Sequence, residues 1–153
     1  MAISPHAVGR ELPSTTVMIE RGRLVFFAQA IGEENPIYSD LEAAYAAGHQ
    51  DLPVPPTFLF GLGIVEPDPF RWIADLGIDM RFVLHGEQSF NYSELAHAGD
   101  ALTLTPVITN VYEKRAGALE FVVRKTTVRK VDGTLVATME ETIVVRHPEL
   151  NAA

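Results

Sequence analysis

The chain has 153 residues, 47% of them hydrophobic and 21% charged, which is typical of one soluble globular domain. Its formal net charge of −8 argues against a general nucleic-acid binder, because such proteins need a basic surface to replace counterions. No apolar run is long enough to cross a bilayer, and the lack of cysteine excludes disulfides and thiolate nucleophiles. We therefore expect one cytoplasmic domain over residues 1–153.

The first part of the chain predicts a short strand followed by two helices. The strand is expected from Thr15 to Ile19. A helix that ends at Gly32 is expected where apolar residues recur at i, i+3, i+4 and i+7, namely Leu24, Phe27, Ala28 and Ile31. Ser39 followed by Glu42 fits a capping box, which predicts that a short helix begins there and runs from Leu41 to Ala47.

The middle of the chain predicts a buried helix. Pro55-Pro56 introduces a segment from Thr57 to Val65 that is apolar on every side, unlike the amphipathic pattern of a surface helix. Two glycines within this segment permit close packing against a neighbouring layer. A polar, proline-containing excursion follows from Glu66 to Asp79 and carries the single tryptophan, Trp72.

The second half changes to the periodicity of strands. Four long strands rich in Val, Ile, Thr and Phe are predicted: Phe82–Glu94, Ala101–Glu113, Leu119–Val131 and Thr134–Arg146. Asp132-Gly133 is a strong signal for a hairpin between the last two. Helices followed by an antiparallel meander indicate an α+β fold, and one buried helix in front of a long curved sheet is the hot-dog arrangement.

Three segments, in this order, resemble the MaoC-like dehydratases and (R)-specific enoyl-CoA hydratases. They are Ile31–Tyr38, similar to the family's Gly-Asp-x-Asn-Pro-aliphatic-His signature, then Leu52–Phe58, and His85–Phe90 with Ala98–Asp100 after it. The third segment resembles the N-terminal, less catalytic type of MaoC-like domain. That type is similar to the subunit of mycobacterial hydroxyacyl-carrier-protein dehydratases that pairs with a catalytic partner. The resemblance implies a long curved antiparallel sheet around one buried central helix.

The signature departs from the family at the two residues that hold the reacting water. Glu33 stands in place of the family's Asp and Tyr38 in place of its His, whereas Asn35 and Pro36 are retained. Glu33 can still accept a proton, but its extra methylene displaces the carboxylate, and errors of about 1 Å are costly in catalysis. A phenol with an unperturbed pKa of about 10 is a poor base at neutral pH. The alternative is a plain turn, with Glu33 solvated and Tyr38 covering the core.

Other candidate site residues lie outside the signature. His49 is a candidate to replace the missing imidazole. The resemblance implies that the start of the central helix meets the thioester oxygen, so Pro56, Thr57 and Phe58 are substrate-binding candidates. His85, which begins a predicted strand, is a further candidate because it matches a position of the family, and a structural role is its alternative. No two histidines have the spacing of metal ligands, so no metal is predicted. The remaining histidines are expected to be solvated: His6, His97 and His147.

Four basic residues lie along one predicted hairpin: Arg124, Lys125, Arg129 and Lys130. Such residues are candidates to contact a phosphate of coenzyme A or an acidic carrier protein. A solvated outer strand face is the commoner reason for such charges.

The resemblance implies reversible hydration of 2-enoyl thioesters to 3-hydroxyacyl thioesters, with coenzyme A or an acyl-carrier protein as the thiol and no separate cofactor. Three hypotheses stay open: a hydratase that uses Glu33, Asn35 and Tyr38 with help from His49, a non-catalytic subunit that binds substrate beside a catalytic chain, and an acyl-CoA thioesterase. Tyr38 favours the second. We expect a homodimer or a heteromer with a related hot-dog subunit, and neither nucleic acid nor membrane as a partner.

Overall fold

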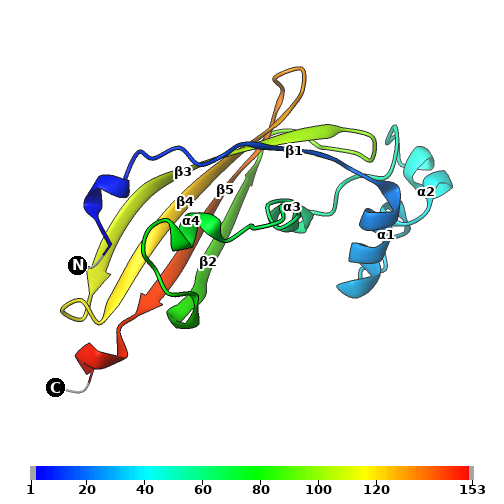
Figure 1. Ribbon diagram of the computed structural model, residues 1–153. Helices are drawn as coiled ribbons and strands as arrows, with labels where there is room; N and C mark the ends of the chain where they lie inside the picture. Colours follow the sequence, from blue (N-terminus) through cyan, green and yellow to red (C-terminus); the bar gives the residue numbers. More distant parts are fainter. Residues whose placement is uncertain (1–2, 152–153) are drawn as a thin grey trace.

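Five antiparallel strands form one long, curved sheet (Figure 1). The computed structural model describes residues 3–151, apart from the side chains of residues 149 and 151; the outermost two residues at each end of the expected domain lie outside it. The strand order is β1-β3-β4-β5-β2. The bounds are β1 Thr15–Met18, β2 Val83–Tyr92, β3 Ala101–Lys114, β4 Leu119–Lys130 and β5 Leu135–Arg146. The five predicted strands are confirmed to within a few residues at their ends.

A bulge interrupts the pairing of the edge strand β2 with β5. The register shifts between His85 and Glu87, so Gly86 is left between the paired positions. A Cβ atom built on Gly86 would lie 2.7 Å from Cγ2 of Val144 and 3.1 Å from the carbonyl oxygen of Thr142. Contacts this short are not tolerated, so the bulge requires glycine at this position.

Four α-helices accompany the sheet: α1 Arg21–Ala30, α2 Leu41–Ala46, α3 Phe58–Leu62 and α4 Arg71–Ala74. Short 3-10 segments cover Pro5–Ala7, Pro36–Tyr38, Met80–Phe82 and Pro148–Asn151. In Figure 1, α1 and α2 extend beyond one end of the sheet, whereas α3 and α4 lie in front of the face that its curvature encloses. None of the helices within residues 3–151 is long and apolar enough to span a membrane.

Two predictions about the helices are wrong in detail. The predicted helix from residue 57 to 65 is not buried on all sides, because α3 ends at Leu62 and the side chains of Ile64 and Val65 are exposed. The capping box at Ser39 does not form. Asp40 caps α2 instead, with Oδ1 accepting a hydrogen bond from the backbone N–H of Ala43 at 2.8 Å.

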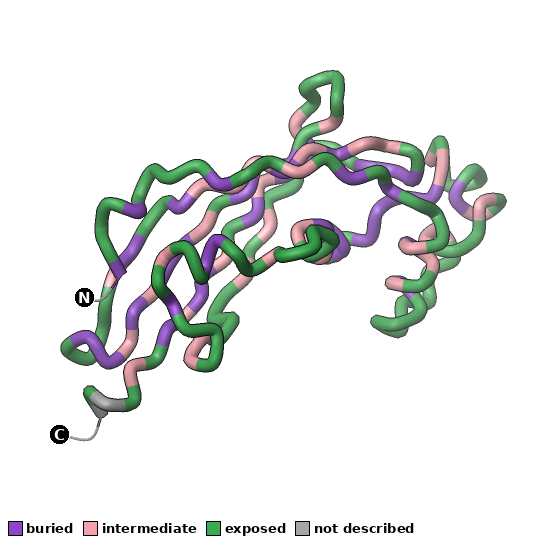
Figure 2. The backbone as a smooth tube through the Cα atoms, viewed as in Figure 1, coloured by how far each residue is buried: buried purple, intermediate pink, exposed green. Residues whose placement is uncertain are grey.

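The hydrophobic core has two parts along the sheet, and Figure 2 shows buried residues along the strands and on α3 and α4. One part packs α1 and α3 against the sheet and includes Leu24, Leu59, Leu62, Leu102 and Val136. The other lies under α4 and includes Trp72, Ile73, Ile108, Val122 and Ile143. The tryptophan of the predicted polar excursion is therefore a core residue, because this excursion contains α4.

Candidate functional site

The signature residues lie in the turn between α1 and α2. Oε1 of Glu33 accepts a hydrogen bond from the backbone N–H of Asn35 at 2.9 Å. Oδ1 of Asn35 accepts one from the N–H of Ile37 at 3.2 Å and so caps the 3-10 segment. Glu33 and Asn35 are exposed and Tyr38 is half-buried. Both polar side chains thus hold the turn, and no hydrogen bond within the described residues joins Glu33 to Tyr38.

His49 contacts a second histidine. Its Nδ1 lies 3.3 Å from Nε2 of His97. His97 is only 9% exposed, so the prediction that it is solvated is wrong. The cause is tertiary: residues 52–54 run antiparallel beside His97, with Pro53 opposite it, and the ring of His49 packs against its ring at a centroid distance of 5.4 Å. Burial, and next the charge of His49, lower the pKa of His97, so the neutral ring is favoured.

The start of α3 presents a mixed surface. Pro56 and Thr57 are exposed, but Phe58 is buried, with its ring edge-on to Phe27 at a centroid distance of 5.3 Å. The Arg23 guanidinium lies 5.8 Å from the centre of the Phe58 ring. Phe58 is therefore a packing residue that fixes α3 against α1, while the two residues before it remain accessible.

His85 lies on the exposed edge strand β2. Its ring packs against Phe60 at a centroid distance of 5.2 Å, and its Nε2 is 3.9 Å from Oε1 of Glu141. At this distance the two groups interact electrostatically rather than through a hydrogen bond. His147, also predicted to be solvated, is instead half-buried, with Nε2 2.8 Å from Glu120. The exposed position of His6 agrees with the prediction.

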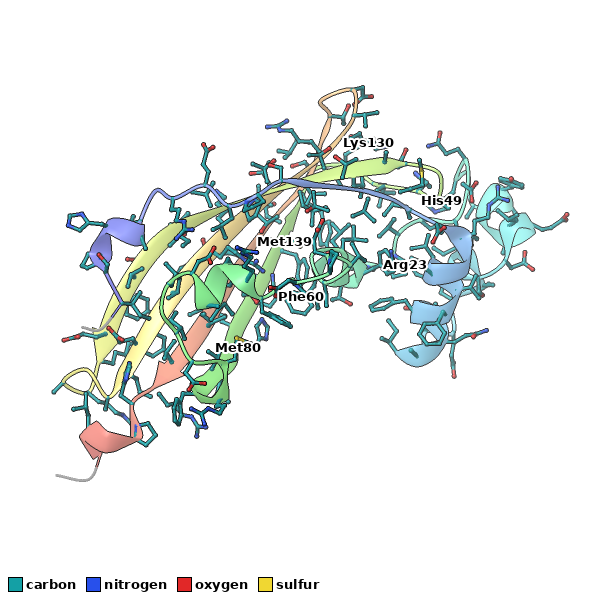
Figure 3. All side chains as sticks on the ribbon, viewed as in Figure 1. Arg23, His49, Phe60, Met80, Lys130 and Met139 are labelled. Carbon is teal, nitrogen blue, oxygen red and sulfur yellow. The ribbon has the colours of Figure 1, made fainter. Side chains whose placement is uncertain are left out.

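A large cavity of about 480 Å³ lies between the sheet and the segment from α3 to α4. Its apolar wall includes Leu12, Phe60, Trp72, Leu104 and Met139. Phe60 and Met139, both labelled in Figure 3, belong to its α3 and β5 walls. None of the predicted catalytic residues lines this cavity, and neither do the substrate-binding candidates Pro56, Thr57, Phe58 and His85; of the basic residues proposed to contact coenzyme A or a carrier protein, only Arg124 does. A volume of this size suits a small-molecule ligand.

A row of polar side chains crosses the sheet beside the apolar wall. Gln88 of β2 is paired with Glu141 of β5, which is paired in turn with Arg124 of β4, and all three line the cavity. Nη2 of Arg124 lies 2.5 Å from Oε2 of Glu141, and its guanidinium lies 4.7 Å from the centre of the Trp72 ring. Charge, hydrogen-bond capacity and a flat aromatic surface thus converge at one place.

The four basic residues of the hairpin do not form one basic surface, because each has different surroundings. The expectation of a solvated outer face is wrong for Arg124, which is half-buried and faces the cavity, and it holds for Lys125. Arg129 donates to the carbonyl oxygen of Gly133 at 2.9 Å, and Lys130, labelled in Figure 3, lies 3.0 Å from Asp100. The sequence did not reveal the polar row, because its members come from three strands whose register is not readable from their spacing.

No group of three or more His, Asp or Glu side chains within residues 3–151 is arranged to hold a metal ion. The polar atoms around the cavity belong to arginines, carboxylates, an amide and hydroxyls. Two of its four carboxylates, Asp75 and Glu141, are ion-paired with arginines, and Glu66 accepts a hydrogen bond from Thr15. The chemistry available here is hydrogen bonding and ion pairing.

Comparison with known proteins assigns the family. The family model described as "FAS1-like, dehydratase domain region" matches residues 6–139. The chain belongs to this dehydratase family. Two relatives in it are UPF0336 proteins. SCO4636 of Streptomyces coelicolor is 42% identical over 114 residues, covering 71% of this chain and 73% of the relative. Lxx02810 of Leifsonia xyli is 39% identical over 150 residues, covering 96% and 98%.

Solved structures show the same fold. The HadBC (3R-hydroxyacyl-ACP dehydratase) complex of Mycobacterium tuberculosis aligns with a TM-score of 0.75 and 23% identity, over 90% of this chain and 96% of that chain. A MaoC-like dehydratase gives 0.81 and 20%, over 94% of this chain but 43% of the longer neighbour. The (R)-hydratase of A. caviae gives 0.66 and 18%, over 89% and 94%. The predicted hot-dog α+β fold and the resemblance to MaoC-like dehydratases are confirmed.

Proposed function

We propose that this chain is the substrate-binding subunit of a cytoplasmic hydratase–dehydratase that acts on 2-enoyl and 3-hydroxyacyl thioesters of coenzyme A or an acyl-carrier protein. A related hot-dog chain supplies the acid–base dyad. The membership of the dehydratase family and the fold support the reaction class. Glu33 and Tyr38 replace the family's Asp and His, which supports the assignment of acid–base catalysis to the partner chain.

The observation that carries this proposal is the separation of the signature from the cavity. Hydration of an enoyl thioester requires a base and an acid around a water molecule, and donors for the charge that develops on the thioester oxygen. Glu33 instead bonds the backbone of its own turn and is exposed, and Tyr38 supplies a phenol in place of an imidazole. The chain offers a binding cavity but a poor dyad.

The free edge of the sheet supports a partner chain. β2 pairs with β5 on one side only, and Leu84 and Tyr92 of this strand expose 47% and 42% of their surface. Unpaired edge strands readily add a further strand from another chain. Both HadBC and the ChsH1–ChsH2 complex of Mycobacterium tuberculosis, which aligns with a TM-score of 0.66 and 22% identity, are complexes of two named subunits.

In this arrangement the present chain binds and orients the acyl group, and its apolar wall excludes water from it. The partner removes the proton from C2 of the 3-hydroxyacyl thioester and protonates the departing hydroxyl, which leaves as water. Hydration is the reverse. Orientation by a binding subunit lowers the barrier because the reacting groups are held in place before the reaction begins.

The test is hydration of crotonyl-CoA and of a longer 2-enoyl-CoA, followed by loss of enoyl absorbance. The chain is assayed alone and together with a MaoC-like chain from the same genome that carries the Asp and His. We expect no turnover by the chain alone and turnover by the pair. Glu33→Ala and Tyr38→Phe in this chain should leave the rate of the pair within about twofold, because neither group exchanges the proton.

Glu34→Ala is the matched control for Glu33→Ala, since Glu34 is an exposed carboxylate next to it in the same turn. Turnover by the chain alone that Glu33→Ala and Tyr38→Phe abolish, and that Glu34→Ala preserves, would refute the proposal. The chain would then be a hydratase with a rebuilt dyad.

A further inference from the structure

The cavity contains polar atoms that the protein itself leaves without hydrogen bonds. Nε of Arg124 and Oε1 of Gln88 are buried, and neither has a hydrogen-bond partner within the described residues. Both side chains line the cavity. Oε2 of Glu141, another lining residue, is also buried without a hydrogen bond, although it is ion-paired with Arg124. Buried polar atoms are nearly always paired in proteins, so unpaired atoms of three residues around one cavity indicate a ligand group that completes them.

Arg124 is held firmly in this position. Its Nη2 is ion-paired with Glu141, and the face of its guanidinium lies over Trp72, so the side chain is fixed both at its tip and across its plane. Gln88 is oriented by a hydrogen bond from its Nε2 to the carbonyl oxygen of Ser89 at 3.2 Å. The result is a fixed donor and a fixed acceptor.

The charges around the cavity disfavour an anion. The lining contains three arginines, Arg10, Arg71 and Arg124, and four carboxylates, Glu66, Asp68, Asp75 and Glu141. Arg10 and Arg71 both lie near Asp75, at 3.5 and 3.9 Å, so one of their two positive charges is compensated there, and the remaining carboxylates outweigh the other. An anionic ligand would meet a slight excess of negative charge, and its acceptor oxygens would face Oε1 of Gln88.

We propose that the cavity binds an acyl group that bears a second, uncharged oxygen substituent remote from its thioester, either a hydroxyl or an amide. Such a group both accepts a hydrogen bond from Nε of Arg124 and donates one to Oε1 of Gln88. Its hydrocarbon part packs against the apolar wall. Only the thioester end of this ligand rests on the proposed function. The preference for an uncharged polar substituent at the other end follows from the residues of the cavity.

The position of the cavity supports a remote substituent. The cavity walls come from the sheet, from the N-terminal segment before β1, and from α3, α4 and the chain between them, and include no residue of α1, α2 or the turn between those two helices. In Figure 1, α3 lies between α4 and the α1–α2 pair. A group bound between Arg124 and Gln88 is therefore separated from the signature turn by α3.

The experiment measures binding of small probes without a thioester by isothermal titration calorimetry on the full chain. The probes are octanamide, octanol and octanoate. We expect octanamide and octanol to bind about tenfold more tightly than octanoate, because all three probes accept a hydrogen bond from Nε of Arg124 but only the uncharged ones donate one to Oε1 of Gln88. Gln88→Leu should abolish this preference, and Arg124→Lys should weaken the binding of the two uncharged probes. Arg124→Lys retains the positive charge beside Glu141 but removes Nε–H.

Arg81→Lys is the matched control, because Arg81 is an exposed arginine that is ion-paired with Asp79 and does not line the cavity, and it should retain both the affinities and the preference. Circular dichroism and thermal unfolding establish that each variant is folded; Gln88→Leu breaks no ion pair and so tests the idea even if Arg124→Lys does not fold. Equal affinity for octanamide and octanoate, or a preference that survives Gln88→Leu, would overturn the inference. If the uncharged probes are preferred but acyl-CoA does not bind, the inference stands and the proposed function fails.

Discussion

The side chain of Glu120 is completely buried, and its Oε2 lies 2.8 Å from Nε2 of His147. Its Oε1 accepts a hydrogen bond from the backbone N–H of Ile3 at 3.1 Å. One carboxylate at the beginning of β4 therefore binds segments close to both ends of the chain. Burial of a carboxylate is tolerated here because both oxygens have a donor.

His147→Ala should lower the free energy of unfolding by about 3 kcal/mol, because it leaves Oε2 of the buried Glu120 without its hydrogen-bond partner. Glu120→Gln in the same background should recover part of this loss, since a neutral amide costs less to bury and its oxygen still accepts from Ile3. Urea unfolding of the wild type, the two single variants and the double variant measures both effects. A double variant less stable than His147→Ala alone would contradict this explanation.

Acid should destabilise the protein partly through His97. Burial lowers its pKa in the folded state below the usual 6.5, so at a pH below 6.5 the unfolded chain binds more protons than the folded one. This contribution to stability is complete above pH 6.5 and is lost as the pH falls toward the folded pKa. The groups acting on His97 are His49 and Lys130, which lower its pKa, and Asp100 and Asp51, which raise it.

Thermal unfolding of the wild type and of His97→Gln between pH 7.5 and about 5 measures this contribution. We expect the stability difference between the two proteins to shrink as the pH falls. His6→Gln is the control, because His6 is exposed and its replacement should leave the pH dependence unchanged. Parallel curves for the wild type and His97→Gln would show that His97 does not titrate in this range.

Gly86→Ala should loosen the edge strand. The added methyl group would meet Val144 at 2.7 Å, so either β2 or β5 must shift, at a cost of about 1–3 kcal/mol. Hydrogen exchange should show faster exchange of the β2 amides than in the wild type. The control is Gly22→Ala, because the added carbon has free space around it. Gly133→Ala would not serve, since Gly133 has a φ of 91°, which strains any residue with a side chain. Unchanged exchange in β2 would contradict the assignment of the bulge.

The sequence by itself determined the local elements. Alternating Val, Ile and Thr residues predicted β3, β4 and β5, and the apolar spacing from Leu24 to Ile31 predicted α1, because these patterns depend on neighbours along the chain. The retained Asn35-Pro36 predicted the turn after α1, which forms with Asn35 as its cap. The resemblance of the same turn to a known signature identified the family.

Only the tertiary structure decided which side chains come together. The Gln88–Glu141–Arg124 row depends on the register of three strands, and the bulge at Gly86 shifts that register locally. His97 looks like a surface residue in the sequence and is buried, because distant residues lie against it: Pro53 pairs beside it and the ring of His49 packs on its ring. Strand pairing and loop packing join residues that are distant in the chain. The pattern of neighbouring residues therefore does not show which of these distant residues will be in contact.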